Sequence, residues 1–193
     1  MRRIAQHYMR WTLLCMSPLL IGSCSAPAQG NAKSASPTKG EPVRFSYFTP
    51  DGQPINSEWA RGRATLLLFI TTYDLASQLE AKRVNELVMA RVPRINAVAV
   101  ILEVPTYAAF APAFSESLGL RYPVVFAGQV KLEDDAGLGP VNLVPTLVLL
   151  DPAGFVTWRH EGPAERREIE AALDAIVRGR TDEEALPTHS DMQ

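Results

Sequence analysis

The residues whose types could best take part in catalysis or binding lie in "LLLFITTYDLASQLE", residues 66–80. There an apolar run passes through a polar turn into a helical pattern. A carboxylate, Asp74, and a hydroxyl, Ser77, stand three residues apart there. Aspartate just before a helix is a favoured N-cap, whose carboxylate accepts a first-turn N–H and stabilises by ~1 kcal/mol. The helix dipole favours the same charge by ~0.3–1 kcal/mol. We therefore expect Asp74 to accept the N–H of Ala76 or Ser77; a ligand-binding or catalytic carboxylate is the alternative.

Two other kinds of site are poorly supported by the sequence. A nucleophilic serine needs a histidine base and an oxyanion hole. Beyond residue 23 the histidines are His160, in an edge-strand pattern that suggests an exposed or half-buried structural role, and His189, near the C-terminus. Asp74, Glu80 and His160 lack the spacing of a metal-ligand set. We predict neither a Ser–His–Asp triad nor a metal or other cofactor.

The first 23 residues have the pattern of an export signal. Arg2, Arg3 and Arg10 precede the short apolar core "WTLLCMSPLLIG". The following "LIGSCS" resembles a lipobox, which would make Cys24 the lipidated first residue after cleavage. An ordinary signal cut near "SAPA", with Cys24 a free thiol, is the alternative. We expect a periplasm-facing lipoprotein of the bacterial cell envelope, held in the bilayer through acylated Cys24.

Cleavage and acylation would leave the mature chain without a free thiol, because Cys15 and Cys24 are its 2 cysteines. Removing residues 1–23 leaves 16 Lys+Arg against 21 Asp+Glu, so the net charge falls from −2 to −5. No basic cluster is present, and we expect no nucleic-acid partner. Ser25 stands where some bacteria use aspartate to retain lipoproteins in the inner membrane, which slightly favours the outer membrane.

Composition divides the rest of the chain into three parts. Residues 24–42 are small, polar and proline-bearing, which predicts a flexible tether. Residues 43–179 are long enough for one domain with a core of its own. Residues 180–193 are acidic and polar, which predicts a disordered tail.

Residues 43–179 alternate between strand and helix patterns. "VRFSYF" and the turn "TPDGQPI" predict an N-terminal hairpin, while "ATLLLFI" and "INAVAVILEV" are typical of strands buried on both faces. "YPVVFA" predicts a short strand, and "PTLVLLD" and "FVTWRHEG" a second hairpin. Glu103, after the second buried strand, is expected to cap or to pair with an arginine. The pattern predicts an α/β fold, a central mixed β-sheet flanked by helices.

Three helices are predicted, each with a core-facing stripe. Residues 75–92 place Leu79, Val84, Leu87 and Ala90 on one face, although Arg83 and Arg91 interrupt it. Residues 106–118 do the same with Tyr107, Phe110 and Phe114, before a stop near Gly119. In the last helix the stripe is Ile169, Ala172, Leu173, Ile176 and Val177, with Gly179 at the expected C-terminal cap.

Residues 43–178 resemble thioredoxin-like proteins of the TlpA and redoxin type, many of which are exported and membrane-tethered. The likeness lies in "DGQPINSEWARGRATLLLFITTYD", "LGLRYPVVF" and "VNLVPTLVLLDPAGFVTWRHEG". It implies a thioredoxin-like fold, and it places Val144-Pro145-Thr146 in the loop whose proline is cis and faces the active site. That family delivers W-C-x-P-C-x-x-E-x-P at the first helix, so the comparison can be made position by position.

The departures from that pattern bear on function. Tyr73 stands at the family's tryptophan, Asp74 and Ser77 at its two cysteines, and Ala76 and Lys82 at its two prolines, while Glu80 keeps the acid. Disulfide exchange needs a thiolate nucleophile and a resolving thiol, which a carboxylate and a hydroxyl cannot replace.

The resemblance without the cysteines favours a binding or scaffold module of the cell envelope that captures an unidentified protein or peptide in a polar groove. The predicted groove residues are Tyr73, Asp74, Ser77, Gln78, Glu80, Val144, Pro145 and Thr146. A thiol-disulfide oxidoreductase or peroxidase, by resemblance alone, and a structural lipoprotein with an empty groove are the alternatives.

Overall fold

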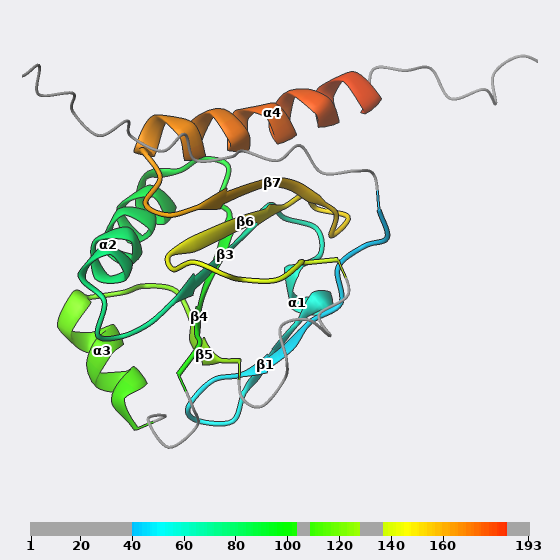
Figure 1. The fold of residues 1–193 in the computed structure, drawn as a ribbon. Helices are drawn as coiled ribbons and strands as arrows, with labels where there is room; N and C mark the ends of the chain where they lie inside the picture. The colour runs from blue at the N-terminus through cyan, green and yellow to red at the C-terminus, as the bar shows by residue number, and fades with distance from the viewer. Residues whose placement is uncertain (1–39, 104–108, 128–136, 185–193) are drawn as a thin grey trace, which may run out of the picture. The chain divides into compact units, whose positions relative to one another are not determined.

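The structure is a computed structural model that describes residues 40–103, 109–127 and 137–184. Its strands form one seven-stranded sheet in the order β2-β1-β5-β4-β3-β6-β7, drawn in Figure 1. The strands are β1 (Ser46–Phe48), β2 (Pro54–Asn56), β3 (Thr65–Ile70), β4 (Asn96–Ile101), β5 (Val124–Phe126), β6 (Thr146–Leu150) and β7 (Val156–Glu161). The helices are α1 (Ser57–Ala60), α2 (Leu75–Ala90), α3 (Phe110–Leu118) and α4 (Arg166–Glu184).

The centre of the sheet is mixed, as predicted. β3 runs parallel to β4 and antiparallel to β6, and every residue of β3 is buried. Alternate β3 side chains enter two separate cores, so Leu66 and Leu68 face one layer while Leu67 and Phe69 face the other. A strand buried on both faces must be apolar at every position, which explains the continuous run in the sequence.

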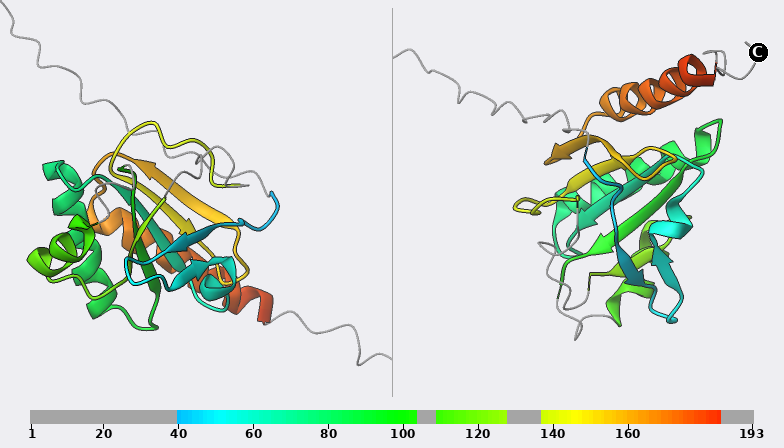
Figure 2. Two further views of the ribbon diagram at one scale, coloured as in Figure 1. Left: turned by 90° about the horizontal axis from the view of Figure 1, so that it is seen from below. Right: turned by 90° about the vertical axis from the view of Figure 1, so that its right-hand side faces the viewer.

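Each face of the sheet has its own cover. α2, α3 and α4 supply Val84, Phe114, Ile169 and other buried residues to the first core. Figure 2 shows α2 and α3 beside each other on that face, and Figure 1 shows α4 lying along β7. The second core is closed by Val43, by Ala60 of α1 and by Leu138. No helix in the described part of the chain combines the length and the apolar character needed to span a membrane.

The predicted hairpins and the end of α3 are confirmed. β1 and β2 pair antiparallel around the Asp51-Gly52 turn, and β6 and β7 pair around Asp151–Gly154. Gly119 follows α3 with a left-handed φ of 63°, and its N–H donates to the carbonyls of Ser115 and Glu116. Glycine adopts this conformation without the Cβ clash of other residues, so it ends the helix.

The prediction that the last helix ends at Gly179 is wrong. α4 continues to Glu184, so residues 180–184, assigned to the tail, are helical. Glycine in a helix interior costs only ~0.5–1 kcal/mol relative to alanine, which does not stop a helix that continues on both sides. The short helix α1, which the sequence pattern did not predict, has Asn56 as its N-cap, and the Asn56 side chain accepts the N–H of Trp59.

Two predicted core stripes are partly wrong. In α2, Leu79 is 55% exposed and Ala90 is also exposed, whereas Val84 and Leu87 are buried as expected. In α3, Phe114 is buried but Phe110 is 58% exposed, and Tyr107 lies outside the described residues. The buried face of α2 is Ser77, Glu80, Ala81, Val84 and Leu87. Polar side chains therefore take the first turns of the buried face, and the leucines there turn outward.

Several expectations concern parts of the chain that the structure does not describe. They are the export signal over residues 1–23, lipidation at Cys24, the tether as far as residue 39, and the end of the tail over residues 185–193.

Candidate functional site

The topology gathers the predicted site residues at one edge of the sheet. β3 and β4 are parallel and end together, since Ile70 pairs with Ile101. β6 is antiparallel to β3 and begins there, with Thr146 opposite Phe69. Residues 71–80, Glu103 and the loop before Thr146 therefore lie around the carboxyl ends of the parallel strands, where α/β proteins bind ligands.

Asp74 caps α2, as predicted. Its Oδ2 accepts the backbone N–H of Ser77 at 2.8 Å and the hydroxyl of Ser77 at 2.8 Å. These bonds from the Ser77 hydroxyl and then from its N–H hold the pKa of Asp74 below its usual range, against a smaller opposing effect of burial. The carboxylate is thus committed to charge-assisted hydrogen bonds with its own helix.

Ser77 is fully buried and has no histidine base within the described structure. Its hydroxyl donates to Asp74 and accepts the N–H of Thr71 at 3.4 Å. His160 lies elsewhere, with its Nε2 3.2 Å from the carbonyl oxygen of Pro163 and its ring stacked on Trp158. His160 is buried, not exposed or half-buried as expected, and its contacts are structural. No group of three His, Cys, Asp or Glu side chains suited to a metal ion occurs among the described residues.

Glu103 holds the turn after β3 in place. Its Oε1 accepts the backbone N–H and the hydroxyl of Thr72, each at 2.5 Å. Gln78 adds a second tie, because its Nε2 donates to the carbonyl of Thr72 at 2.8 Å. Glu103 thus caps a backbone N–H, as expected in kind, without the arginine partner. Sequence reasoning missed Thr72. The available signal was that Thr72 and Glu103 follow two parallel strands, β3 and β4, which end at the same edge of the sheet.

Glu80 is fully buried beneath the first turns of α2. Its Oε2 accepts a hydrogen bond from Nη1 of Arg83, which also donates to the carbonyl of Ala164 at 2.6 Å. Burial raises the pKa of Glu80, and Arg83 opposes that rise. Burial, with a contribution from Glu80, likewise raises the pKa of Tyr122, whose hydroxyl donates to the carbonyl of Ala81 at 2.9 Å. The i,i+3 spacing of Glu80 and Arg83 could have indicated this pair.

Three buried side-chain oxygens have no hydrogen-bond partner among the described residues. They are Thr71 Oγ1, Glu80 Oε1 and Glu103 Oε2. All three belong to the polar region around the start of α2. An unsatisfied buried polar group costs ~1–3 kcal/mol. The polar region around the start of α2 is therefore less stable than apolar packing at the same place would be.

The Val144–Pro145 peptide bond is cis, as the resemblance implied. The carbonyl of Pro145 accepts the N–H of Gly162 at 2.7 Å, and the Thr146 hydroxyl donates to the carbonyl of Leu143 at 2.5 Å. No hydrogen bond within the described part of the chain uses the backbone N–H or C=O of Val144. Hydrogen bonds therefore hold the loop on both sides of Val144, while the backbone groups of Val144 remain available to a binding partner.

The eight predicted groove residues differ in accessibility. Tyr73 is 79% exposed, and Asp74, Gln78 and Val144 are half-buried. Ser77, Glu80, Pro145 and Thr146 are buried, so they support the surface without forming it. The sequence missed two exposed apolar neighbours, Leu75 at 67% and Leu143 at 52%. The predicted polar groove is thus polar beneath and apolar along its rim.

Comparisons with known proteins identify the fold. No family model matches the chain, and no curated protein matches it. Among solved structures, the thiol:disulfide interchange protein of the thioredoxin family from Chlorobium tepidum is 20% identical, with a TM-score of 0.58 over 74% of this chain and 99% of that one. A DsbF homologue from Corynebacterium diphtheriae is 14% identical, with a TM-score of 0.65 over 78% of this chain and 96% of its own.

A secreted thiol-disulfide isomerase from Corynebacterium glutamicum is similar as well. It is 16% identical, with a TM-score of 0.64 over 79% of this chain and 96% of that chain. These likenesses show the predicted thioredoxin-like fold, an α/β fold with a mixed sheet flanked by helices.

Replacing Asp74 should reveal the cap and its charge. We expect Asp74→Ala to lower the free energy of unfolding by about 1 kcal/mol at neutral pH. The folded pKa lies below the unfolded value of about 3.9, so this stabilisation is present above that pH and is lost as the pH falls through the folded pKa. Urea unfolding of Asp74→Ala and Asp74→Asn across acid pH checks this. Asparagine also caps, so Asp74→Asn should lose little; an Ala penalty that is constant with pH would contradict the assignment.

The contribution of the buried Glu80 to stability should change with pH in the direction opposite to that of Asp74. Because the pKa of Glu80 is raised, we expect the wild type to lose stability relative to Glu80→Gln as the pH rises from about 4.3 towards the folded pKa. Arg83→Ala should cost at most about 3 kcal/mol at neutral pH, at the low end for buried pairs because Arg83 is partly exposed.

The double variant Glu80→Gln/Arg83→Ala serves as the control for that pair. It should regain most of the stability lost in Arg83→Ala, since no uncompensated charge is left buried. Additive losses in chemical denaturation would show that the two side chains do not interact.

Proposed function

We propose that this chain is an exported, lipid-anchored binding or scaffold module of the bacterial cell envelope, which uses a thioredoxin-like frame without redox cysteines. Export and anchoring are supported by the signal pattern of residues 1–23 and by the lipobox-like "LIGSCS" around Cys24. The structural likeness to a secreted thiol-disulfide isomerase agrees with a place outside the cytoplasm. The partner is an envelope protein or peptide, and the acyl chains supply the contact with the bilayer.

The observation that carries this proposal is the occupation of the two redox positions. Asp74 and Ser77 stand where the resembling family has cysteines, and they bond to each other as a helix cap. A thiolate must attack a disulfide sulfur for exchange to occur, and neither a carboxylate nor a hydroxyl can form the mixed disulfide. The backbone has the arrangement that the resemblance implies, including the cis bond before Pro145. Positions 74 and 77, however, have no sulfur atom for disulfide exchange.

What remains at this edge is suited to holding an extended peptide. The N–H and C=O of Val144 are unpaired within the described structure and can bond to a strand-like segment. The exposed side chains of Tyr73, Leu75 and Leu143 provide apolar contacts on either side of that backbone. Backbone pairing gives affinity and side-chain contacts give selectivity in this mode of recognition. We infer a partner segment that is extended and carries apolar side chains.

The alternative function is a thiol-disulfide oxidoreductase or peroxidase, and the observation favouring it is the thiol-disulfide activity named for two of the similar structures. It would require a thiol supplied from outside the frame, since Cys15 and Cys24 both lie before residue 40.

Peptide capture should depend on the apolar rim. Binders selected from a display library of short unstructured peptides should bind the full chain about tenfold more weakly after Tyr73→Ala/Leu143→Ala, because aromatic and aliphatic anchors dominate such contacts. The matched control Phe48→Ala/Met89→Ala removes two apolar side chains elsewhere that are also more than half exposed, and it should change little. Fluorescence anisotropy measures both. Failure to enrich any peptide, or equal losses in the two variants, would favour the structural lipoprotein with an empty groove.

An insulin-reduction assay distinguishes the oxidoreductase alternative from the proposed binding module. With Cys15 and Cys24 alkylated, we expect no reduction above buffer, since no thiol remains. The variant Asp74→Cys/Ser77→Cys places a dithiol at the start of α2, where the helix dipole lowers a thiol pKa, and should gain dithiothreitol-dependent insulin reduction. Clear insulin reduction or peroxide consumption by the alkylated wild type would overturn the proposal.

A further inference from the structure

A cavity of about 410 Å³ lies at the opposite edge of the sheet from Asp74 and Pro145. It is bordered by Ala64 and Ile95, the residues that immediately precede β3 and β4. Its volume falls within the range of about 300–1,000 Å³ that is typical of small-molecule sites. The candidate site around Asp74 and Pro145 does not include this cavity.

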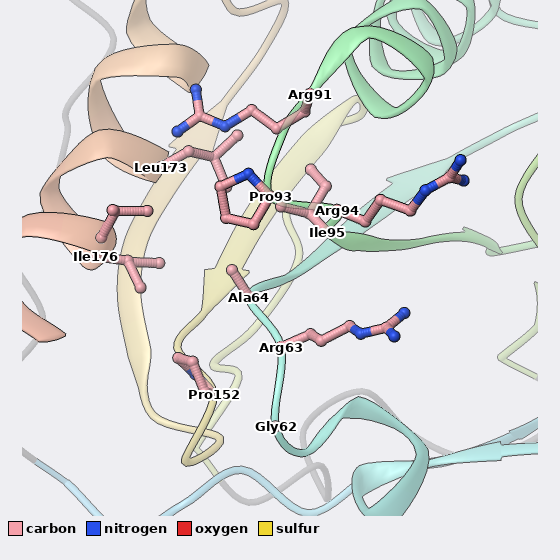
Figure 3. Close-up of a pocket in the computed structure, with 11 residues that line it drawn as sticks. Gly62, Arg63, Ala64, Arg91, Pro93, Arg94, Ile95, Pro152, Leu173 and Ile176 are labelled. Carbon is pink, nitrogen blue, oxygen red and sulfur yellow. The ribbon is translucent and has the colours of Figure 1, made fainter.

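One side of this cavity is apolar. α4 contributes Leu173 and Ile176, the segment before β4 contributes Pro93 and Ile95, and the β6–β7 turn contributes Pro152. Figure 3 shows Leu173 and Ile176 projecting from α4 on one side, with Pro93 above and Pro152 below. Apolar walls of this kind favour the hydrocarbon part of a ligand.

The charged residues of the lining are all cationic. Arg63, Arg91 and Arg94 line the cavity, and no carboxylate does. Arg91 is occupied, because its Nη2 lies 2.5 Å from Oδ1 of Asp174. Arg63 and Arg94 are exposed, and neither side chain forms an ion pair or hydrogen bond with another described residue.

The two unpaired arginines stand at matching places on neighbouring segments, each two residues before the paired Thr65 and Asn96. The N–H of Asn96 donates to the carbonyl of Ala64 at 2.9 Å, and Thr65 pairs with Asn96 in the parallel ladder. Figure 3 shows the side chains of Arg63 and Arg94 both extending to the side away from Leu173 and Ile176, while Arg91 turns toward Leu173. Neighbouring like charges repel each other, and an anion between them removes that cost and gains charge-assisted hydrogen bonds.

A second cavity of about 570 Å³ shares Pro152 and Ile176 with the first. Trp158 and Ala172 give it an apolar lining as well. Its carboxylate, Asp151, is committed to the turn, since its Oδ1 accepts the N–H groups of Ala153 and Phe155 at 2.9 Å each. The two cavities therefore adjoin at Pro152 and Ile176, the first on the side of the arginines and the second between α4 and Trp158 of β7.

We propose that this pair of cavities, the α4 slot, binds a single-chain amphiphile with an anionic oxygen headgroup. The hydrocarbon chain lies against Leu173, Ile176 and Pro152, and the headgroup lies between the guanidinium groups of Arg63 and Arg94. A fatty carboxylate and an alkyl phosphate share this chemistry, because an arginine fork accepts either head. The inference is independent of the proposed function, since it uses neither Asp74 nor the Pro145 loop.

Calorimetric titration of the full chain tests the proposal with dodecanoate and dodecyl phosphate, both kept below their critical micelle concentrations. We expect saturable binding of at least one of them, with the better ligand identifying the headgroup. Dodecanol and butanoate should bind much more weakly, because the first lacks the charge and the second lacks the chain. In the variant Trp11→Phe/Trp59→Phe, which retains Trp158 as its tryptophan, the change in fluorescence should follow the same isotherm.

Paired variants locate the site. Arg63→Gln/Arg94→Gln should weaken binding roughly fivefold or more, as expected for two partly solvated ion pairs. The control Arg44→Gln/Arg121→Gln removes the same charge from exposed positions outside the α4 slot and should leave affinity unchanged. Ile176→Ser should also weaken binding. The proposal is overturned if neither amphiphile binds, if dodecanol binds as well as dodecanoate, or if both arginine pairs lose affinity equally.

Discussion

The arrangement of the candidate site depends on a carboxylate that is buried beneath α2. Glu80 is fully buried, and it is bonded to Arg83, which also bonds the carbonyl of Ala164 ahead of α4. A buried charge is tolerated only where donors meet it. This requirement fixes the rotation of α2 about its axis and connects α2 to the segment that follows β7. With Glu80 turned inward, Ser77 is also directed inward, three residues earlier on the same face.

The rotation of α2 accounts for what the neighbouring surface presents. Ser77 reaches Asp74 and Thr71 because it faces the sheet, and Leu75 and Leu79 are exposed because they do not. The helix therefore begins with a polar interior and an apolar exterior, the reverse of an ordinary surface helix. Such an inversion is expected at functional sites, where local rules are broken for a purpose other than stability. A binding surface of exposed Tyr73, Leu75 and Leu143 is consistent with that.

The two proposals assign different ligand chemistry to the two ends of the sheet. At the carboxyl ends of β3 and β4 the chain offers free backbone groups of Val144 and apolar side chains, which suit a peptide. At the amino ends it offers unpaired arginines and an apolar slot under α4, which suit an amphipathic anion. Both surfaces are bordered by loops placed by the same rigid strands, which is how one scaffold supports separate sites.

The sequence by itself determined the α/β class, the order of the strands and helices, the hairpin turns and the N-cap at Asp74. These follow from interactions among residues close in the chain: period-two and period-3.6 patterns, turn residues, and a side chain that reaches three residues ahead. The absence of cysteine at positions 74 and 77 was likewise evident from the sequence, because it depends on residue type alone.

The tertiary structure decided which face of α2 is buried, that Glu103 holds Thr72, that α4 passes Gly179, and that Arg63 and Arg94 line one cavity. Each of these depends on residues far apart in the chain, or on a balance between a small local penalty and the packing that overrides it. A stripe of leucines predicts burial only when no buried charge competes for the same face. Here Glu80 is buried while Leu79 is exposed, and Arg83 donates the hydrogen bond that stabilises the buried carboxylate.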